Sequence, residues 1–123
     1  MIHLDTNFLV TALRPNSPQQ FQLDAWLLGG ESAGISSVAW AEYLCGPLDP
    51  MGEAIARQMF PNPESLLSTD AEKAAYLFNL TGRRSRSLAD CMIAAIAIRC
   101  GARIATINRA DFQPFVPHGL VLA

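Results

Sequence analysis

The sequence has little charge and no long apolar run, and each shortage excludes a class of protein. Asp, Glu, Lys and Arg make up 16% of the 123 residues, and half of the chain is hydrophobic, which argues against a disordered chain. No segment approaches the roughly 20 apolar residues of a membrane-spanning helix. We therefore expect one folded domain, residues 1–123, that buries its own core.

Cysteine is also scarce, and its spacing excludes two further classes. Cys45, Cys91 and Cys100 show no Cys-x-x-Cys pattern, so neither a zinc site nor a disulfide framework is indicated. Each lies in an apolar helical stretch, which predicts buried thiols in a reducing compartment. No basic segment leads into a long apolar one after Met1, so no secretory signal is expected. We predict a cytoplasmic protein.

Positive charge is too sparse for general nucleic-acid binding. The net charge is −2, and Lys73 is the only lysine. A protein that held nucleic acid through phosphate neutralisation alone would be basic. Any chemistry on nucleic acid must therefore depend on a local site, for which arginine suits phosphate recognition.

Short β-like runs alternate with helical patterns along the chain. Strands are expected at 1–4, 34–37, 65–68 and 103–107, with a short fifth at 120–122. Helices are expected at 7–13, 17–29, 38–45, 52–60, 69–80 and 87–99. A capping box, Thr69 with Glu72, is predicted to start the helix at 69–80. This alternation predicts an α/β fold with a parallel sheet covered on both faces.

Three solitary carboxylates interrupt the apolar sequence. Asp5 is the only charged residue between Met1 and Leu13, and it follows the first strand. Glu42 and Asp90 are equally isolated within two predicted helices. Carboxylates are rarely buried unless they are paired, hydrogen-bonded or bound to a metal. A shared site at the carboxyl edge of the sheet would explain all three.

Each acid also has a structural interpretation. Asp5 could cap the first helix, and Asp90 could form a capping box with Ser87. Glu42 has no capping role, because it lies about one turn into its helix. The helical period places it beside Val38 and Cys45, on a stripe expected to pack inward.

Polar residues also follow the last long strand. Thr106, Asn108 and Asp111 come at or after its carboxyl end, which is the same sheet edge as Asp5. Taken alone they could form an ordinary strand-to-helix turn. The basic loop with Arg83, Arg84 and Arg86 precedes the Asp90 helix. These arginines could contact phosphate, or the loop could simply be solvated.

Taken together, these motifs resemble the PIN domain. The resemblance rests on Asp5-Thr6-Asn7, on Glu42, on Asp90 followed by Ile93-Ala94-Ala95, and on Thr106-x-Asn108-x-x-Asp111-Phe112. It covers nearly the whole chain and is strongest toward the short VapC-type toxins of bacterial toxin–antitoxin pairs. It implies a three-layer α/β/α sandwich with a parallel sheet of four or five strands.

The resemblance also implies an endoribonuclease that uses Mg²⁺, with Mn²⁺ as a substitute, and a cognate antitoxin that covers the site. Asp5, Glu42, Asp90 and Asp111 would bind the metal, and Asn108 would join them in catalysis. Many members carry an acid where this chain has Asn108, so Asn108 and Asp111 share that role. Thr6 and Thr106 would hydrogen-bond to the ligands. A homodimer is also implied.

Two other classes compete with this interpretation. A receiver-type signalling domain would need a phosphoacceptor Asp after its third strand and a lysine near its last. Here Asp70 falls inside a helix, and Lys73 lies in the same helix. A PIN scaffold without catalysis is the second alternative. The intact Asp5, Glu42 and Asp90 argue against it, whereas the Asn108 position keeps it open. His3, inside a strand, and His118, in a Pro/Gly turn, are not expected to be catalytic.

Overall fold

A sheet of four short parallel strands forms the centre of the protein. The computed structural model describes residues 1–84 and 87–123. The strands are β1 (Ile2–Leu4), β2 (Ala33–Gly34), β3 (Arg103–Ala105) and β4 (Val121–Leu122), in the spatial order β2-β1-β3-β4. Ile2 lies opposite Ala33 on one side and Arg103 on the other. The parallel sheet predicted from the sequence is confirmed.

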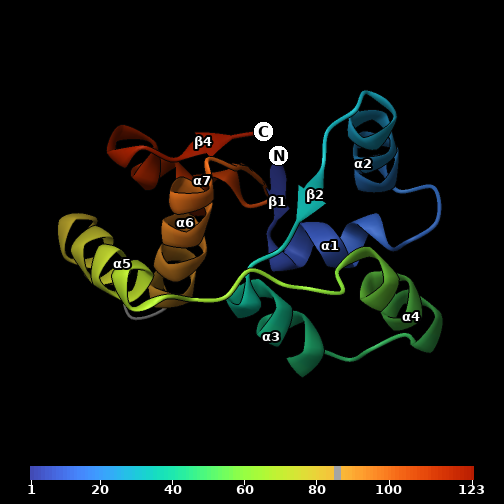
Figure 1. Cartoon of the computed structure of the whole chain (residues 1–123), viewed down its shortest axis with the longest axis horizontal. Coiled ribbons are helices and arrows are strands. Elements are labelled where there is room, and N and C mark those ends of the chain that lie inside the picture. Colours follow the sequence, from blue (N-terminus) through green and yellow to red (C-terminus); the bar gives the residue numbers. More distant parts are fainter. Residues whose placement is uncertain (85–86) are drawn as a thin grey trace.

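Helices cover this sheet in the three-layer α/β/α arrangement expected from the sequence (Figure 1). They are α1 (Thr6–Ala12), α2 (Pro18–Leu28), α3 (Ser37–Cys45), α4 (Pro50–Met59), α5 (Ser68–Leu80), α6 (Leu88–Cys100), the short α7 (Arg109–Phe112) and the 3-10 helix η2 (Gln113–His118). In this view β1 and β2 lie between the α5–α6 pair and the α1–α2 pair. Among the described residues, no helix is long and apolar enough to span a membrane.

Helix α6 is central because it is apolar around most of its circumference. Its side chains Cys91, Ile93, Ala94, Ala95, Ile96 and Ala97 are all buried. The helix packs against α5, α3, α7 and β3, so little of its surface is left for solvent. Burying each large aliphatic side chain contributes about 1.5–3 kcal/mol. This packing fixes the first turn of α6, which carries Asp90.

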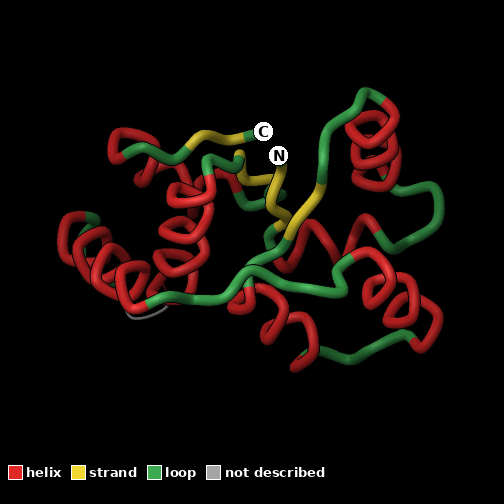
Figure 2. Tube along the Cα trace, viewed as in Figure 1, coloured by secondary structure: helices red, strands yellow, loops and turns green. Residues whose placement is uncertain are grey.

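The predicted strand at 65–68 is wrong. Only Glu64 pairs, through an isolated bridge to Ser36, and α5 begins at Ser68 (Figure 2). The bridge cannot extend because the chain turns into α3 directly after Ser36, the N-cap residue of that helix. The Ser37 N–H still donates to the Glu64 carbonyl, whereas the N–H groups of Ala39 and Trp40 donate to Ser36 at the start of the helix. For the same reason β2 ends at Gly34 and not at residue 37.

The cap of α5 also differs from the predicted one. Helix α5 begins after Leu67, whose N–H donates to the Asp70 carboxylate at 2.8 Å. Thr69 and Glu72 therefore lie inside the helix. The same Asp70 carboxylate is buried and accepts from Arg99 Nε at 2.9 Å, which ties the start of α5 to the end of α6.

The cysteines and His3 follow the prediction in part. All three thiols are free, but only Cys91 is buried, and Cys45 is exposed at the end of α3. The expectation of three buried thiols is therefore wrong for Cys45. His3 is buried within β1, as a packed strand residue. Of the basic loop, Arg83 and Arg84 are described, whereas Arg86 lies outside the described residues.

Candidate metal-dependent active site

Asp5 lies where β1 ends and α1 begins, and both of its oxygens are engaged. It is the N-cap residue of α1, and Oδ1 accepts from the Thr6 N–H at 2.8 Å. Oδ2 accepts from the Thr106 hydroxyl at 3.0 Å. Asp5 is therefore a cap, as one interpretation predicted, and is also tied to the end of β3. Only 5% of its surface is exposed.

Burial raises the pKa of Asp5 above its ordinary value. The hydrogen bonds from Thr106 and Thr6 act in the opposite direction, whereas the charges of Glu42 and Asp111 raise the pKa further. The carboxylate is thus held in place by two donors while other acids approach it. A positive charge among these acids would relieve the repulsion.

Glu42 reaches the same region from α3, but not by the route predicted. It is exposed, because α3 buries Ala39 and Tyr43 instead of the stripe through Val38 and Cys45. The expectation that Glu42 packs inward is therefore wrong. Its Oε1 accepts from the Thr6 hydroxyl at 2.9 Å, and Thr6 directly follows Asp5 in the chain.

Asp90 lies in the first turn of α6 and is half-buried. Burial, followed by the charges of Asp5, Asp111 and Glu42, raises the pKa of Asp90 from 3.8 to about 7. The predicted capping box with Ser87 is absent from the described residues. The Ser87 N–H and hydroxyl both donate to the Arg84 carbonyl, at 2.9 Å and 2.8 Å. Asp90 is therefore a carboxyl group that three other acids repel.

The segment after β3 completes the cluster. Thr106 is buried, and its hydroxyl both donates to Asp5 and accepts the Asn108 N–H at 2.9 Å. Asn108 is the N-cap residue of α7, and its side chain makes no cap hydrogen bond. Asp111 is exposed on α7 and lines one cavity with Asp90. The structure thus brings together the four predicted acids, with Thr6 and Thr106 bonded to two of them.

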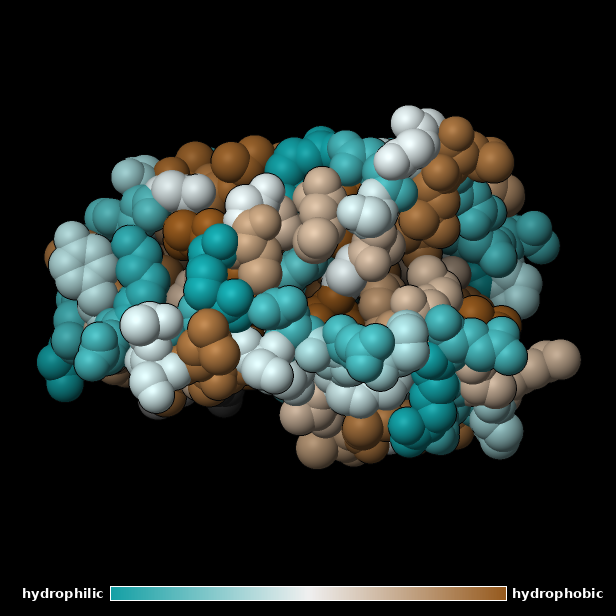
Figure 3. Space-filling model, in the orientation of Figure 1, coloured by the Kyte–Doolittle hydropathy of each residue, from teal (hydrophilic) through white to brown (hydrophobic). Residues whose placement is uncertain are grey.

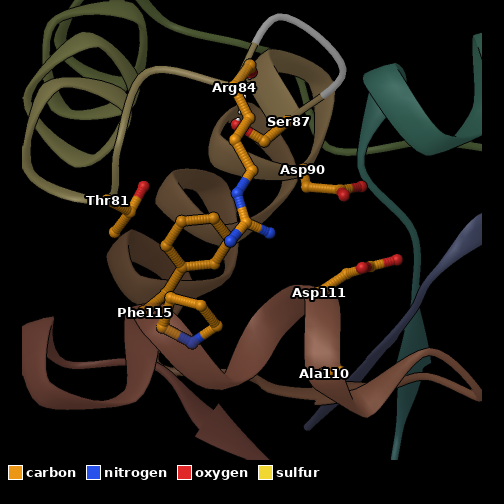
Figure 4. A pocket seen from close by; sticks show the side chains of 8 residues that line it. Thr81, Arg84, Ser87, Asp90, Ala110, Asp111 and Phe115 are labelled. Atoms are coloured by element: carbon orange, nitrogen blue, oxygen red, sulfur yellow. Dashed lines mark hydrogen bonds between the residues drawn. The ribbon is translucent and has the colours of Figure 1, made fainter.

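A cavity of about 370 Å³ opens beside these acids. Asp90 and Asp111 line one side of it, and Thr81, Arg84, Ser87 and Phe115 contribute to the rest (Figure 4). Thr81 and Phe115 are not among the residues predicted for the site. Nothing in the sequence marks them, because they come from the end of α5 and from η2 and meet only in the folded chain.

The chemistry of these side chains suits a hard divalent cation. No three His, Cys, Asp or Glu side chains within residues 1–84 and 87–123 are close enough to hold one ion as they stand. Mg²⁺ does not require such a cage, because it usually keeps several waters and binds through one or two carboxylates. Burial raises the pKa of Asp90 most, and repulsion from the other acids raises it further; a bound cation would offset this repulsion. The residues therefore fit a Mg²⁺-type ion.

The fold belongs to a known class. The sequence model of the PIN domain matches residues 2–113, so the chain is a member of the PIN domain family. A sequence search of curated proteins gives no match.

Solved structures share the same fold. FitAcB from Neisseria gonorrhoeae has a TM-score of 0.73 at 20% identity, covering 100% of this chain and 97% of the other. VapBC2 from Rickettsia felis, bound to a DNA fragment from its promoter, has a TM-score of 0.72 at 20% identity, covering 100% and 98%. A toxin–antitoxin complex from Klebsiella pneumoniae has a TM-score of 0.73 at 24% identity, covering 91% and 90%.

Proposed function

We propose that this PIN domain is an endoribonuclease that uses Mg²⁺ or Mn²⁺ to hydrolyse phosphodiester bonds in RNA. The observation that carries the proposal is the convergence of Asp5, Glu42, Asp90 and Asp111. Burial, followed by the charges of Asp5, Asp111 and Glu42, raises the pKa of Asp90 to about 7. A scaffold without catalysis has no need of four mutually repelling acids, which weaken the fold.

Each side chain has a role that follows from its contacts. Asp5 and Asp90 are the direct metal ligands, and the Thr6 N–H and Thr106 hydroxyl orient Asp5. Glu42, oriented by the Thr6 hydroxyl, binds the ion or positions the attacking water. A bound divalent cation lowers the pKa of water and neutralises charge on the phosphoryl oxygens.

Asp111 completes the site. It is the acid nearest in sequence to the position where many relatives carry a carboxylate, and it lines the cavity with Asp90, its side chain extending to the same side (Figure 4). Asn108 supports it through the turn, because its N–H is bonded to Thr106. We therefore assign the negative charge of the fourth ligand position to Asp111, and we assign to Asn108 an uncharged supporting role at the same position.

The biological setting follows from the relatives. Structures similar in fold are toxin–antitoxin complexes, so we propose a VapC-like toxin with a cognate antitoxin that covers the acids. We further propose a cytoplasmic homodimer. Exposed apolar side chains support self-association, among them Leu28 and Phe21 on α2. Figure 3 shows hydrophobic surface in the region of α2. Light scattering in solution would give twice the chain mass for the dimer.

A cleavage assay tests the proposed activity. Wild type is incubated with a labelled single-stranded RNA in Mg²⁺, in Mn²⁺ and in EDTA. We expect cleavage with either metal, none in EDTA and none for Asp90→Asn, which removes a charge while preserving the side chain's shape. Asp24→Asn is the matched control, because Asp24 is exposed on α2, away from the site. Cleavage that survives EDTA or Asp90→Asn would contradict the proposal.

A further inference from the structure

Arg84 is the cation that lines the cavity beside Asp90 and Asp111. Its side chain reaches into this space, and its guanidinium group faces the side on which the two acids lie (Figure 4). The residue is exposed, so the group is accessible from solvent. Arg84 is the one cation among the described residues that line this cavity with Asp90 and Asp111, so its role there requires an explanation.

Most of the other described arginines differ from Arg84 in what they contact, whereas Arg14 lines a separate cavity with Glu42. Arg57, Arg99 and Arg103 form ion pairs with acids, and Arg109 donates to the Ala123 carbonyl. The ion pairs and side-chain hydrogen bonds of the described residues include none from the Arg84 guanidinium, although two carboxylates share its cavity. Within residues 1–84 and 87–123, no side-chain hydrogen bond or ion pair therefore engages its five N–H groups.

Arg83 gives the contrast within the same loop. Its Nη1 donates to Asn79 Oδ1 at 3.0 Å, and its guanidinium lies 6.0 Å from the centre of the Phe78 ring. Arg83 is thus held against α5 and does not line the cavity. Two adjacent arginines with the same charge have different surroundings, and only one faces the acids.

We infer that Arg84 is a phosphate-binding residue of this active site and positions the RNA backbone across the cavity from the acids. The inference rests on the proposed ribonuclease function and adds to it the side on which the substrate lies. A planar guanidinium can donate two parallel hydrogen bonds to a phosphate, and the cavity size is typical of a ligand pocket.

This placement explains how an acidic protein could bind RNA. The net charge of −2 gives no general attraction for phosphate. With a cation on the Asp90 side and Arg84 on the opposite wall, the phosphodiester would meet positive charge from both directions. Arg84 would act on substrate binding, whereas the acids would act on the cation.

The test compares three variants in RNA binding. A fluorescein-labelled single-stranded RNA of mixed sequence is titrated with each protein in a buffer that contains Ca²⁺, and binding is measured. Gels confirm that the RNA stays intact. We expect Arg84→Ala to weaken binding about tenfold or more, as for one lost charge-assisted contact. The slope of log K against log salt should fall by about 0.7. Arg83→Ala should change binding less than twofold, and Arg84→Lys should restore the slope but only part of the affinity.

Cleavage kinetics in Mg²⁺ give the second readout. Arg84→Ala should raise KM while kcat stays within a few-fold of wild type, because the lost contact serves binding. The inference would be overturned if Arg84→Ala and Arg83→Ala had equal effects, or if neither had an effect. Cleavage by wild type in the same assay would still support the proposed ribonuclease function. If wild type neither binds nor cleaves the RNA, the proposed function fails first and the inference fails with it.

Discussion

Neutralising Asp90 should stabilise the protein at neutral and alkaline pH in the absence of metal. Its carboxyl group has a pKa of about 7 when folded and 3.8 as the ordinary value. At about 1.36 kcal/mol per pKa unit, this difference corresponds to about 4 kcal/mol. Solvent screening of a half-buried group lowers the effect, and we expect about 2–4 kcal/mol.

The direction of the pH dependence follows from which state holds the proton. Between about pH 4 and pH 7 the unfolded chain has ionised Asp90, whereas the folded chain keeps it protonated. The folded state binds more protons in this window, so stability falls as pH rises through it. Above pH 7 the loss is complete, and below pH 4 it is absent. Asp90→Asn stays neutral throughout and does not suffer this loss.

Urea unfolding in EDTA at several pH values measures this effect. The free energy of unfolding of Asp90→Asn should exceed that of wild type by about 2–4 kcal/mol at pH 8 and match it near pH 4. Asp24→Asn, which neutralises an exposed acid on α2, should follow wild type at every pH. Parallel curves for wild type and Asp90→Asn from pH 4 to pH 8 would refute the repulsion on which the site rests.

Three further predictions follow from the contacts. Mg²⁺ at about 100 times its Kd should stabilise wild type by about 2.7 kcal/mol in thermal melts at pH 8, and an unchanged melting temperature would argue for a scaffold. Asp5→Ala should lower the free energy of unfolding at pH 5 by about 2–3 kcal/mol, because the Thr6 N–H and the Thr106 hydroxyl lose their acceptor. Arg99→Ala should lower the free energy of unfolding in urea by about 3 kcal/mol, because it leaves the buried Asp70 without its cation. Cleavage per folded Arg99→Ala molecule should stay normal, since Arg99 lies at the opposite end of α6 from Asp90.

The central elements of the fold could be predicted from local sequence. The apolar stretch of α6 and the Gly101 that ends it are both visible in the sequence. In the structure Gly101 has a φ of 65°, the left-handed conformation that favours glycine at the end of a helix. Ser17 and Pro18 likewise marked the start of α2 correctly. Such signals are local, since each depends on a few neighbouring residues.

The failures involve partners that are distant in sequence. Residues 65–68 have strand character, yet only Glu64 has a partner, because the opposite chain enters α3 after Ser36. Asp70 replaces the predicted Thr69–Glu72 box, since Arg99 holds its carboxylate from 29 residues away. Periodicity alone could not give either outcome.

In the candidate site too, features that depend on local sequence could be predicted, whereas features that depend on distant contacts could not. Asp5, Glu42 and Asp90 were identified because each is a lone charge in an apolar segment, and the structure brings them together. The orientation of Glu42 was not predictable from the period of α3, because burial of Ala39 and Tyr43 decides which face packs. The position of Arg84 in the cavity depends on how α5, α6 and η2 meet, which no local pattern encodes.

Direct measurement of Mn²⁺ binding tests the central claim that these carboxylates form a cation site. Calorimetric titration at pH 8 should show saturable binding to wild type and to Asp24→Asn. Asp90→Asn should bind at least tenfold more weakly, because it lacks a direct ligand. Absence of saturable binding to folded wild type, or equal binding by wild type and Asp90→Asn, would contradict the account.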